Sequence, residues 1–336
     1  MKIIKKIILP LVLLMSVTGC GNGGATSHSS YIPSPDLTSP LYVKKVENLK
    51  EDLVIGMDSS QVIALENSGV KYYNYKGEEE DVFKILRDNG INTIRVRIWN
   101  DPFDKEGHGY GGGNCDINVA VAIAKRAYKY DLNFMPSFHY SDFWADPSKQ
   151  MSPKAWKNLD SWADVGNACY EYTKDCLKKI KETGVNITHV SVGNETNGGK
   201  VAGSTAFSTS KYIFNGGSKA VREICPNAKV VLHFANPEKA NNYRDYATKL
   251  KDNKVDYDVF GSSYYPYWHG TLDNLSSILN EIATTYDKDV MIMENSYAFN
   301  ELDTDFSGNT IPASGIDVPY PYTVQGNLLL LKRQSG

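Results

Sequence analysis

The sequence has little cysteine, and the spacing of what it has excludes two common uses of that residue. There are 5 cysteines in 336 residues, and Cys115, Cys169, Cys176 and Cys225 show no spacing typical of a metal site. Cys169 and Cys176 belong to one helical pattern and lie about 10 Å apart along its axis, too far for a disulfide. We therefore expect these four residues to be mostly buried thiols.

An excess of charge of one sign is also missing. Lys and Arg number 36 against 39 Asp and Glu, so the net charge is -3 and gives no electrostatic reason to expect nucleic acid as a partner. Aromatic residues make up 11% of the chain and include 22 tyrosines. That content would suit a groove that stacks against sugars, but ordinary core packing explains most of it. The length allows one barrel-sized domain or two smaller ones.

Residues 1–19 are predicted to be a targeting segment rather than part of the fold. Three early lysines precede an apolar run, residues 7–17, that is too short to span a bilayer as a stable helix. The following "VTGC" resembles a bacterial lipobox, which implies cleavage before Cys20 and a lipid on that cysteine. The alternative is a plain secretory signal. Both predict export, to the extracellular face of the membrane as a lipid-anchored protein or into the medium.

Residues 20–48 are predicted to be a flexible linker, because 21–40 are rich in Gly, Ser and Pro and nearly free of apolar residues. The remaining residues, 49–336, are predicted to form a single folded domain. From residue 53 onward short apolar runs alternate with amphipathic helical patterns. The predicted strands are 53–59, 92–99, 133–140, 187–195, 229–235, 258–266 and 289–297, and the clearest helices are 78–90, 116–131 and 161–184.

Repeated strand–helix units predict a parallel sheet covered by helices, in the α/β class. Gly90 and Gly184 are placed to end two of the helices. No glycine-rich phosphate loop follows the first strand, which argues against a doubly wound nucleotide-binding sheet. Almost every predicted strand ends in polar or aromatic residues, and a (β/α)8 TIM barrel would bring those ends together at one face.

The strand ends supply a set of candidate site residues. In chain order they are Asp58, Arg95, Arg97, Trp99, His139, Tyr140, Asp142, Trp144, Asn194, Glu195, His233, Asn236, Tyr264, Tyr265, Trp268, His269 and Glu294. Each alone could be a surface residue or a satisfied hydrogen-bonding group. Barrel closure would place Glu195 and Glu294 across one mouth, and two facing carboxyl groups are what glycoside hydrolysis requires.

Several stretches resemble glycoside hydrolase family 53, the arabinogalactan endo-β-1,4-galactanases, over residues 53–325. They are "GMDSSQVIALENSGVKYYNYKG", "NTIRVRIWNDP", "FHYSDFWADPSKQMSPKAW", "VGNETNGG", "SSYYPYWHGTL" and "MENSYAF". "HYSDFWADPSKQ" is the most specific of them, whereas "GNE" is shared by many barrel glycosidases. The resemblance implies endo-acting, retaining hydrolysis of the galactan side chains of pectin.

The resemblance also implies residue roles. Glu195 would be the acid/base, Glu294 the nucleophile and Asn194 the partner of the sugar 2-OH, with Arg97 or Arg95 keeping Glu294 ionised. The remaining substrate contacts are expected from Trp99, His139, Asp142, Trp144, His233, Tyr264, Tyr265 and Trp268. A retaining mechanism predicts about 5–5.5 Å between the two carboxyl groups.

A calcium site is predicted in "DTDFSGN", because its oxygen-bearing residues recur at alternate positions as in the first half of a calcium loop. The predicted ligands are Asp303, Asp305, Ser307 and Asn309. Ser314 stands where such a loop has its bidentate Glu, and a solvated turn is the alternative. We expect no organic cofactor and a monomer.

After Glu294 a further helix–strand–helix unit is expected, and residues 295–336 do not show one. The sequence therefore predicts a barrel that lacks its last unit. Two alternatives to galactan hydrolysis stay open. One is a surface glycan-binding protein that does not cleave. The other is a different retaining β-glycanase, acting on mannan or cellulose.

Overall fold

Seven parallel strands form a single curled sheet in the computed structural model, which describes residue 50, residues 53–298 and residues 322–323. The strands are β1 (Gly56–Asp58), β2 (Thr93–Ile98), β3 (Asn133–Phe138), β4 (His189–Val192), β5 (Lys229–Phe234), β6 (Val259–Ser263) and β7 (Asp289–Glu294). Each pairs in parallel with the next one along the chain. This sequential order has no switch point, so it excludes the doubly wound alternative and confirms the barrel prediction.

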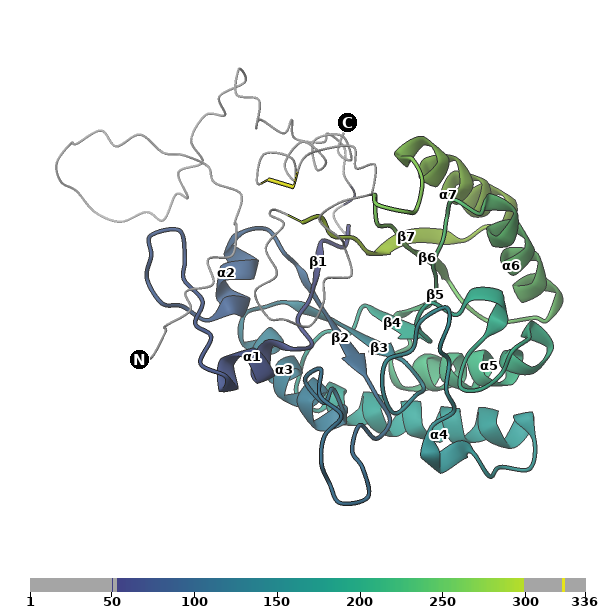
Figure 1. The fold of residues 1–336 in the computed structure, drawn as a ribbon, viewed down its shortest axis with the longest axis horizontal. Helices are drawn as coiled ribbons and strands as arrows, with labels where there is room; N and C mark the ends of the chain where they lie inside the picture. Colours follow the sequence, from purple (N-terminus) through teal and green to yellow (C-terminus); the bar gives the residue numbers. More distant parts are fainter. Residues whose placement is uncertain (1–49, 51–52, 299–321, 324–336) are drawn as a thin grey trace.

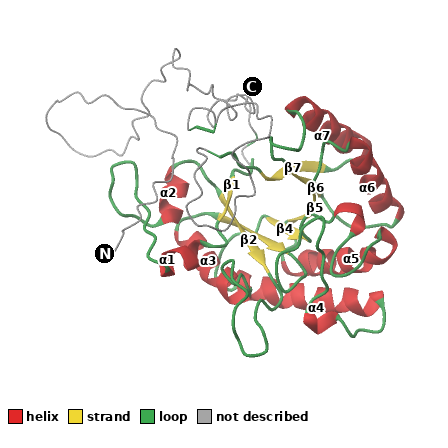
Figure 2. Cartoon of the chain, viewed as in Figure 1, coloured by secondary structure: helices red, strands yellow, loops and turns green. Residues whose placement is uncertain are grey.

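Helices connect the strands and surround the sheet (Figures 1 and 2). They are α1 (Val62–Asn67), α2 (Val82–Asp88), α3 (Ile117–Lys129), α4 (Trp162–Lys181), α5 (Phe207–Ile224), α6 (Ala240–Asp252) and α7 (Leu272–Tyr286), with short 3-10 turns η1 (Lys154–Trp156) and η2 (Asn197–Gly199). Side chains cap the starts of four of these helices, by Asp81, Asp116, Ser161 and Thr271. Gly90 and Gly184 follow the ends of α2 and α4 at positive φ, as predicted.

The two faces of the strands have different neighbours. On β2, Ile94, Val96 and Ile98 are fully buried in the core between sheet and helices. A smaller cluster forms from the opposite side of other strands, with Met135 on β3 and Met293 on β7 among its members. This inner cluster lies inside the curl of the sheet, where alternate side chains of barrel strands meet. Polar residues further along the same strand faces can therefore meet in the same way.

Glycines allow α4 and α5 to pack closely. A Cβ at Gly216 would lie 2.2 Å from the carbonyl oxygen of Gly166, and one at Gly166 would lie 2.6 Å from that of Tyr212. Neither position accepts a side chain without moving a helix. The tight pair supports β4, whose C-terminal end carries the central residues of the site.

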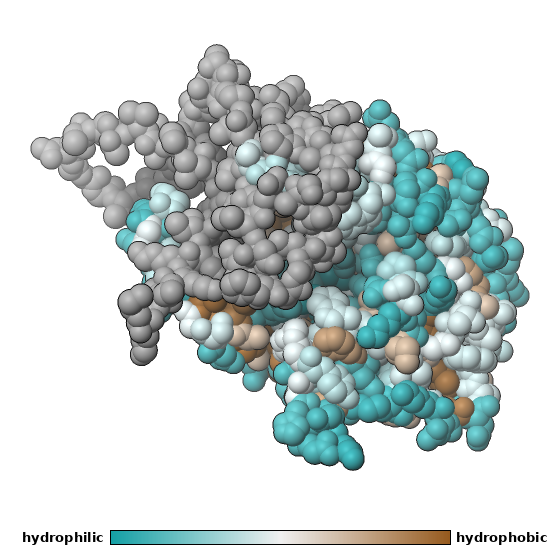
Figure 3. Space-filling view, viewed as in Figure 1, coloured by the Kyte–Doolittle hydropathy of each residue, from teal (hydrophilic) through white to brown (hydrophobic). Residues whose placement is uncertain are grey.

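The four cysteines in the described part of the chain are free and buried, as predicted. Burial raises the pKa of Cys115 to about 11, so this thiol stays protonated and unreactive at neutral pH. Among the described helices none has the length and hydropathy that a membrane crossing requires. On the described part of the surface drawn in Figure 3, apolar residues are scattered between hydrophilic ones.

Candidate active site

A sharp bend after β4 exposes the first of the two carboxyl groups. The strand ends just before Gly193, whose φ is 98° and where a Cβ would lie 2.6 Å from Thr196 Cγ2. Glu195 itself has φ 47°, in the left-handed region that residues with a Cβ rarely adopt. The backbone N–H of Thr196 donates to the carbonyl of His233 (2.8 Å) and ties the bend to β5. Packing on both sides therefore holds Glu195 in a strained conformation typical of functional sites.

The loop between β3 and η1 braces this bend from the other side. Gln150 donates from Nε2 to the carbonyl oxygens of Asn194 (2.7 Å) and Asp146 (3.0 Å). Gln150 is the last residue of "HYSDFWADPSKQ", the stretch on which the family resemblance depends most. One function of that stretch is thus to fix the backbone that carries Asn194 and Glu195.

Arg95 on β2 connects three strand ends. It is 7% exposed, and its guanidinium group bonds Asp58 Oδ2 (2.9 Å), Asn194 Oδ1 (2.9 Å) and Glu294 Oε1 (3.0 Å). Arg95 and Arg97 are the two residues predicted as alternatives for the partner of Glu294. The structure gives the ion pair to Arg95, whereas the guanidinium carbon of Arg97 lies 4.1 Å from the centre of the Trp144 ring.

Glu294, at the end of β7, is held in its ionised form. Tyr265 donates its hydroxyl to Oε2 (2.9 Å) and Arg95 pairs with Oε1. Burial works against ionisation, but the nearby charge of Arg95 and the Tyr265 hydrogen bond lower the pKa of Glu294 below its ordinary value. A carboxylate that stays ionised and is fixed at both oxygens has the properties of a nucleophile.

Glu195 has the opposite surroundings. Burial first, and then the negative charge of Glu294, raise its pKa to about 7. Its Oε1 lies 2.7 Å from the hydroxyl oxygen of Ser263 on β6, and no cation pairs with it among the described residues. The two carboxyl groups therefore hold one proton between them near neutral pH, with the proton on Glu195.

A hydrogen-bonded chain of neutral groups lies behind Glu195. His233 Nε2 is 2.8 Å from Ser263 Oγ, and His233 Nδ1 is 3.1 Å from Asn194 Oδ1. Burial lowers the pKa of His233 to about 3, with Glu294 opposing the shift and Arg95 adding to it. His233 is thus an uncharged, fully buried positioning group rather than a base.

Aromatic rings form one wall beside these groups. Trp144 lies against Trp99 (ring centres 5.4 Å apart) and Phe143 lies against Trp99 at 4.8 Å. Farther along the strand ends, Trp268 is 39% exposed and its ring lies 5.7 Å from that of Tyr265. Trp268 and the half-buried Trp144 therefore offer accessible ring surface near the carboxyl groups, as sugar stacking requires.

Three of the predicted contact residues have contacts within the protein, and two of them, Tyr264 and Trp99, are buried. Tyr264 packs in the core between sheet and helices, and its hydroxyl donates to the Gly270 carbonyl, because alternation sends it to the face opposite Tyr265. Trp99 is fully buried and has no free face for a sugar. Asp142 is partly exposed and accepts a hydrogen bond from the backbone N–H of Lys154 (2.7 Å).

His139 lies in the site but is fully buried, and its Nδ1 accepts from the backbone N–H of Ala145 (3.1 Å). Two residues of the site, Ser263 and Gln150, were not among the predicted site residues. The alternation of β6 could have identified Ser263, because it shares a face with Tyr265 and with Gly261, where a Cβ would lie 2.6 Å from Met293 Cγ. Gln150 lies in a loop and has no strand pattern, but its place in "HYSDFWADPSKQ" could have marked it.

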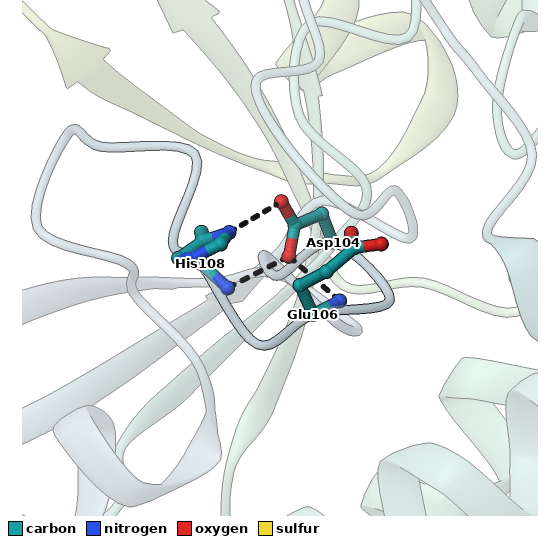
Figure 4. Close-up of side chains that lie close together, drawn as sticks. All are labelled: Asp104, Glu106 and His108. Carbon is teal, nitrogen blue, oxygen red and sulfur yellow. Dashed lines mark hydrogen bonds and ion pairs between the residues drawn. The ribbon is translucent and has the colours of Figure 1, made fainter.

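Two other predicted sites, the lipid-bearing Cys20 and the calcium ligands Asp303, Asp305, Ser307 and Asn309, lie outside the described residues. Within those residues one group of side chains has the proximity of metal ligands, namely Asp104, Glu106 and His108 (Figure 4). Asp104 accepts hydrogen bonds from the backbone N–H groups of Glu106 (3.0 Å) and His108 (2.7 Å). Local turn formation on an exposed loop thus accounts for this group.

Comparison with known proteins adds independent evidence. Residues 54–334 match the model of Glycosyl hydrolase family 53. The chain is 54% identical over 286 residues to the endo-beta-1,4-galactanase of Bacillus subtilis, a match that covers 85% of this chain and 66% of that protein. It is 33% identical over 291 residues to the arabinogalactan endo-beta-1,4-galactanase of Cellvibrio japonicus, covering 82% of this chain and 74% of the other.

Solved structures agree with these matches. The Ignisphaera aggregans GH53 catalytic domain superposes with a TM-score of 0.75 at 35% identity, covering 87% of this chain and 78% of that domain. A fungal beta-1,4-galactanase structure gives a TM-score of 0.72 at 26% identity, with 83% and 82% of the two chains covered.

Proposed function

The chain belongs to glycosyl hydrolase family 53, and from this premise we propose that it cleaves internal β-1,4-galactosidic bonds of galactan and arabinogalactan with retention of configuration. The observation that carries the proposal is the different surroundings of the two carboxyl groups: Glu294 is paired with Arg95 and the Tyr265 hydroxyl, which favour its ionised form, whereas Glu195 contacts the neutral Ser263 hydroxyl. Double displacement needs one acid and one nucleophile at the same bond. The relatives named above as galactanases support the choice of polymer.

In the first step, the Glu294 carboxylate attacks the anomeric carbon while the bond from that carbon to the glycosidic oxygen breaks. The proton of Glu195 passes to this oxygen, so the leaving galactan chain departs as a neutral alcohol. Arg95 holds the attacking carboxylate by its Oε1, and the Tyr265 hydroxyl holds the other oxygen. Both partners fix the geometry of attack before substrate arrives.

In the second step, water attacks the same carbon and Glu294 leaves as a carboxylate. Glu195, now ionised, takes the proton of the water. Esterification removes the negative charge of Glu294, and that charge is one of the causes that raise the pKa of Glu195. Glu195 therefore loses its proton more readily once the intermediate has formed, as its exchange of roles requires.

Asn194 is proposed to position the sugar 2-OH. Its Oδ1 accepts from Arg95 (2.9 Å) and its Nδ2 donates to the carbonyl oxygen of Ala145 (2.9 Å). The amide is therefore fixed, which leaves the second N–H of Nδ2 as the group to offer to substrate. Trp144 and Trp268 supply the ring surfaces for neighbouring sugars.

The test is hydrolysis of linear β-1,4-galactan by the purified 336-residue chain, with product anomers followed by NMR. We expect the β anomer first, no comparable activity on mannan or carboxymethylcellulose, and no activity in Glu294→Gln. An initial α anomer would rule out retention. Binding of galactan without hydrolysis would instead favour the glycan-binding alternative. Preferred cleavage of mannan or cellulose would favour the alternative of a different retaining β-glycanase.

We further propose that the protein is exported and anchored by a lipid at Cys20, which the "VTGC" motif after a short apolar run supports. Cys20→Ala should release the protein into the medium when the chain is expressed in a bacterium with lipoprotein processing. Retention of that variant in the membrane fraction would contradict the anchor.

A calcium ion bound by Asp303, Asp305, Ser307 and Asn309 is also proposed, on the spacing of these oxygen-bearing residues. Calcium should raise the melting temperature over that in EGTA, and Asp303→Asn with Asp305→Asn should abolish the difference. An equal melting temperature under both conditions would overturn the site.

A further inference from the structure

The hydroxyl group of Ser263 lies between the carboxyl group of Glu195 and the imidazole ring of His233. Its oxygen is 2.7 Å from Glu195 Oε1 and 2.8 Å from His233 Nε2, and the residue is fully buried. A serine hydroxyl has one hydrogen and can donate to one of these two neighbours at a time. Which neighbour receives that hydrogen decides whether Ser263 favours the acid or the carboxylate form of Glu195.

The far side of His233 determines its tautomer. Nδ1 is 3.1 Å from Asn194 Oδ1. The orientation of the Asn194 amide is fixed, because its Nδ2 donates to the Ala145 carbonyl and its Oδ1 accepts from Arg95. An amide oxygen can only accept, so His233 must carry a hydrogen on Nδ1.

The near side of the ring is then an acceptor. Burial keeps His233 neutral, so with Nδ1 protonated its Nε2 has a lone pair and no hydrogen. The Ser263 hydroxyl faces this lone pair at 2.8 Å and satisfies it by donating. The serine oxygen is left with lone pairs toward Glu195, and these can only accept. The opposite arrangement, in which the hydroxyl donates to an ionised Glu195 at the same 2.7 Å, would lower the pKa of Glu195 instead.

We propose that Ser263 is a positioning residue that holds Glu195 in its protonated form, by donating to His233 Nε2 and accepting the Oε1 proton of Glu195. The proposal rests on the acid/base role of Glu195 in the proposed function. His233 on β5 and Ser263 on β6 would then together fix the direction of the hydrogen bond between them.

The same arrangement has a consequence during turnover. When Glu195 gives its proton to the glycosidic oxygen, the hydrogen of Ser263 must rotate from His233 Nε2 to Glu195 Oε1. No covalent bond changes, but the lone pair of Nε2 then faces the serine oxygen without a hydrogen between them. The ionised form of Glu195 is thereby disfavoured, which keeps it a strong base toward the incoming water.

Other groups also act on Glu195, and the test must hold them constant. They are Glu294 on β7, Arg95 on β2, Asp146 in the loop after β3, and the hydroxyl groups of Tyr243 and Tyr265. None of them is altered by a substitution at position 263, so the sign of the change in pKa reports the direction of the serine hydrogen bond.

The experiment is a 13C NMR titration of the full 336-residue chain with labelled glutamate carboxyl groups, in which Glu195→Gln identifies the Glu195 signal. In Ser263→Ala the higher pKa of the coupled pair should fall by about one unit. Ser263→Thr keeps the hydroxyl and should retain the wild-type value. An unchanged pKa in Ser263→Ala, or a raised one, would overturn the proposal, because a serine that donates to Glu195 stabilises the carboxylate.

A second measurement needs no variant and therefore does not depend on how Ser263→Ala folds. Long-range 15N–1H correlation on the wild-type chain should show His233 with a protonated Nδ1 and an unprotonated Nε2. The reverse tautomer would also overturn the proposal.

Neither readout requires turnover. A wild-type chain inert on galactan would refute the proposed function and leave the titration result valid. An active wild-type chain whose Ser263→Ala variant keeps the pKa of Glu195 would refute only the role of Ser263.

Discussion

Glu195 and Glu294 have the same side chain, but β4 and β7 deliver them to surroundings of different kinds. Around Glu294 the partners are charged or strongly donating, namely Arg95 at 3.0 Å and the Tyr265 hydroxyl at 2.9 Å. Around Glu195 they are neutral, with Ser263 at 2.7 Å and His233 behind it. The comparison shows how a protein differentiates two identical acids by the neighbours supplied from β2 and β6.

The pKa values of the two carboxyl groups also depend on each other. Arg95 stabilises the charge of Glu294, and that charge in turn helps to raise the pKa of Glu195. One buried cation thus acts on both groups: it lowers the pKa of each directly, while the charge that it stabilises on Glu294 raises the pKa of Glu195. A substitution next to Glu294 should therefore also change the pKa of Glu195, and a substitution next to Glu195 should change that of Glu294.

The largest effect is expected from Glu195→Gln, which removes the acid and leaves the nucleophile. On galactan kcat/KM should fall by about 10²–10⁴-fold. On an aryl galactobioside with a dinitrophenol leaving group the first step should stay close to the wild-type rate, because that leaving group needs no proton. Burst kinetics measure this step, and an equal loss on both substrates would contradict the assignment of Glu195 as the acid.

Arg95→Met should come next, because it leaves both Glu294 and Asp58 without their shared cation. Removing one partner of a buried ion pair costs about 3–5 kcal/mol of stability. The pKa of Glu294 should rise, so the acidic limb of the pH profile of kcat/KM moves to higher pH. Arg97→Met is the matched control, because Arg97 stacks on Trp144 and approaches Asp58 only to 3.9 Å. Equal shifts of the acidic limb in the two variants would contradict the assignment of Arg95 as the partner that keeps Glu294 ionised.

The features of the site that depend on strand periodicity could be predicted from the sequence. The barrel architecture and the position of Glu195 and Glu294 at strand ends followed from the repeated strand–helix pattern, and the structure confirms that architecture. The sequence could not decide between Arg95 and Arg97, because both face inward and only the depth of each side chain in the sheet decides which meets Glu294. Tyr264 was misplaced because it was grouped with Tyr265, although alternation sends these neighbours to opposite faces of β6.

A smaller effect is expected in the pH dependence of stability. The pKa of Glu195 is about 7 in the folded chain, against an ordinary value of 4.5 that applies to the unfolded chain. Protonation of Glu195 therefore stabilises the fold fully below pH 4.5, and this stabilisation is lost as the pH rises through 7. Glu195→Gln stays neutral and should gain on the order of 2 kcal/mol relative to wild type between pH 5 and 8. The contribution of Glu294, whose pKa is lowered, changes below this window. Urea unfolding across that range measures the gain, and a constant difference would refute it.

The smallest and most selective test compares two neighbouring tyrosines. Tyr265→Phe removes the hydroxyl that donates to Glu294, so kcat/KM should fall by about tenfold, the equivalent of one hydrogen bond to a charged group. Tyr264→Phe removes the bond to the Gly270 carbonyl on the other face of β6, and should cost about 1 kcal/mol of stability while activity is unchanged. Steady-state kinetics and thermal unfolding on the same samples separate the two results. If Tyr264→Phe lowered activity as much as Tyr265→Phe, the two faces of β6 would not be independent, and the environment of Glu294 would extend into the core.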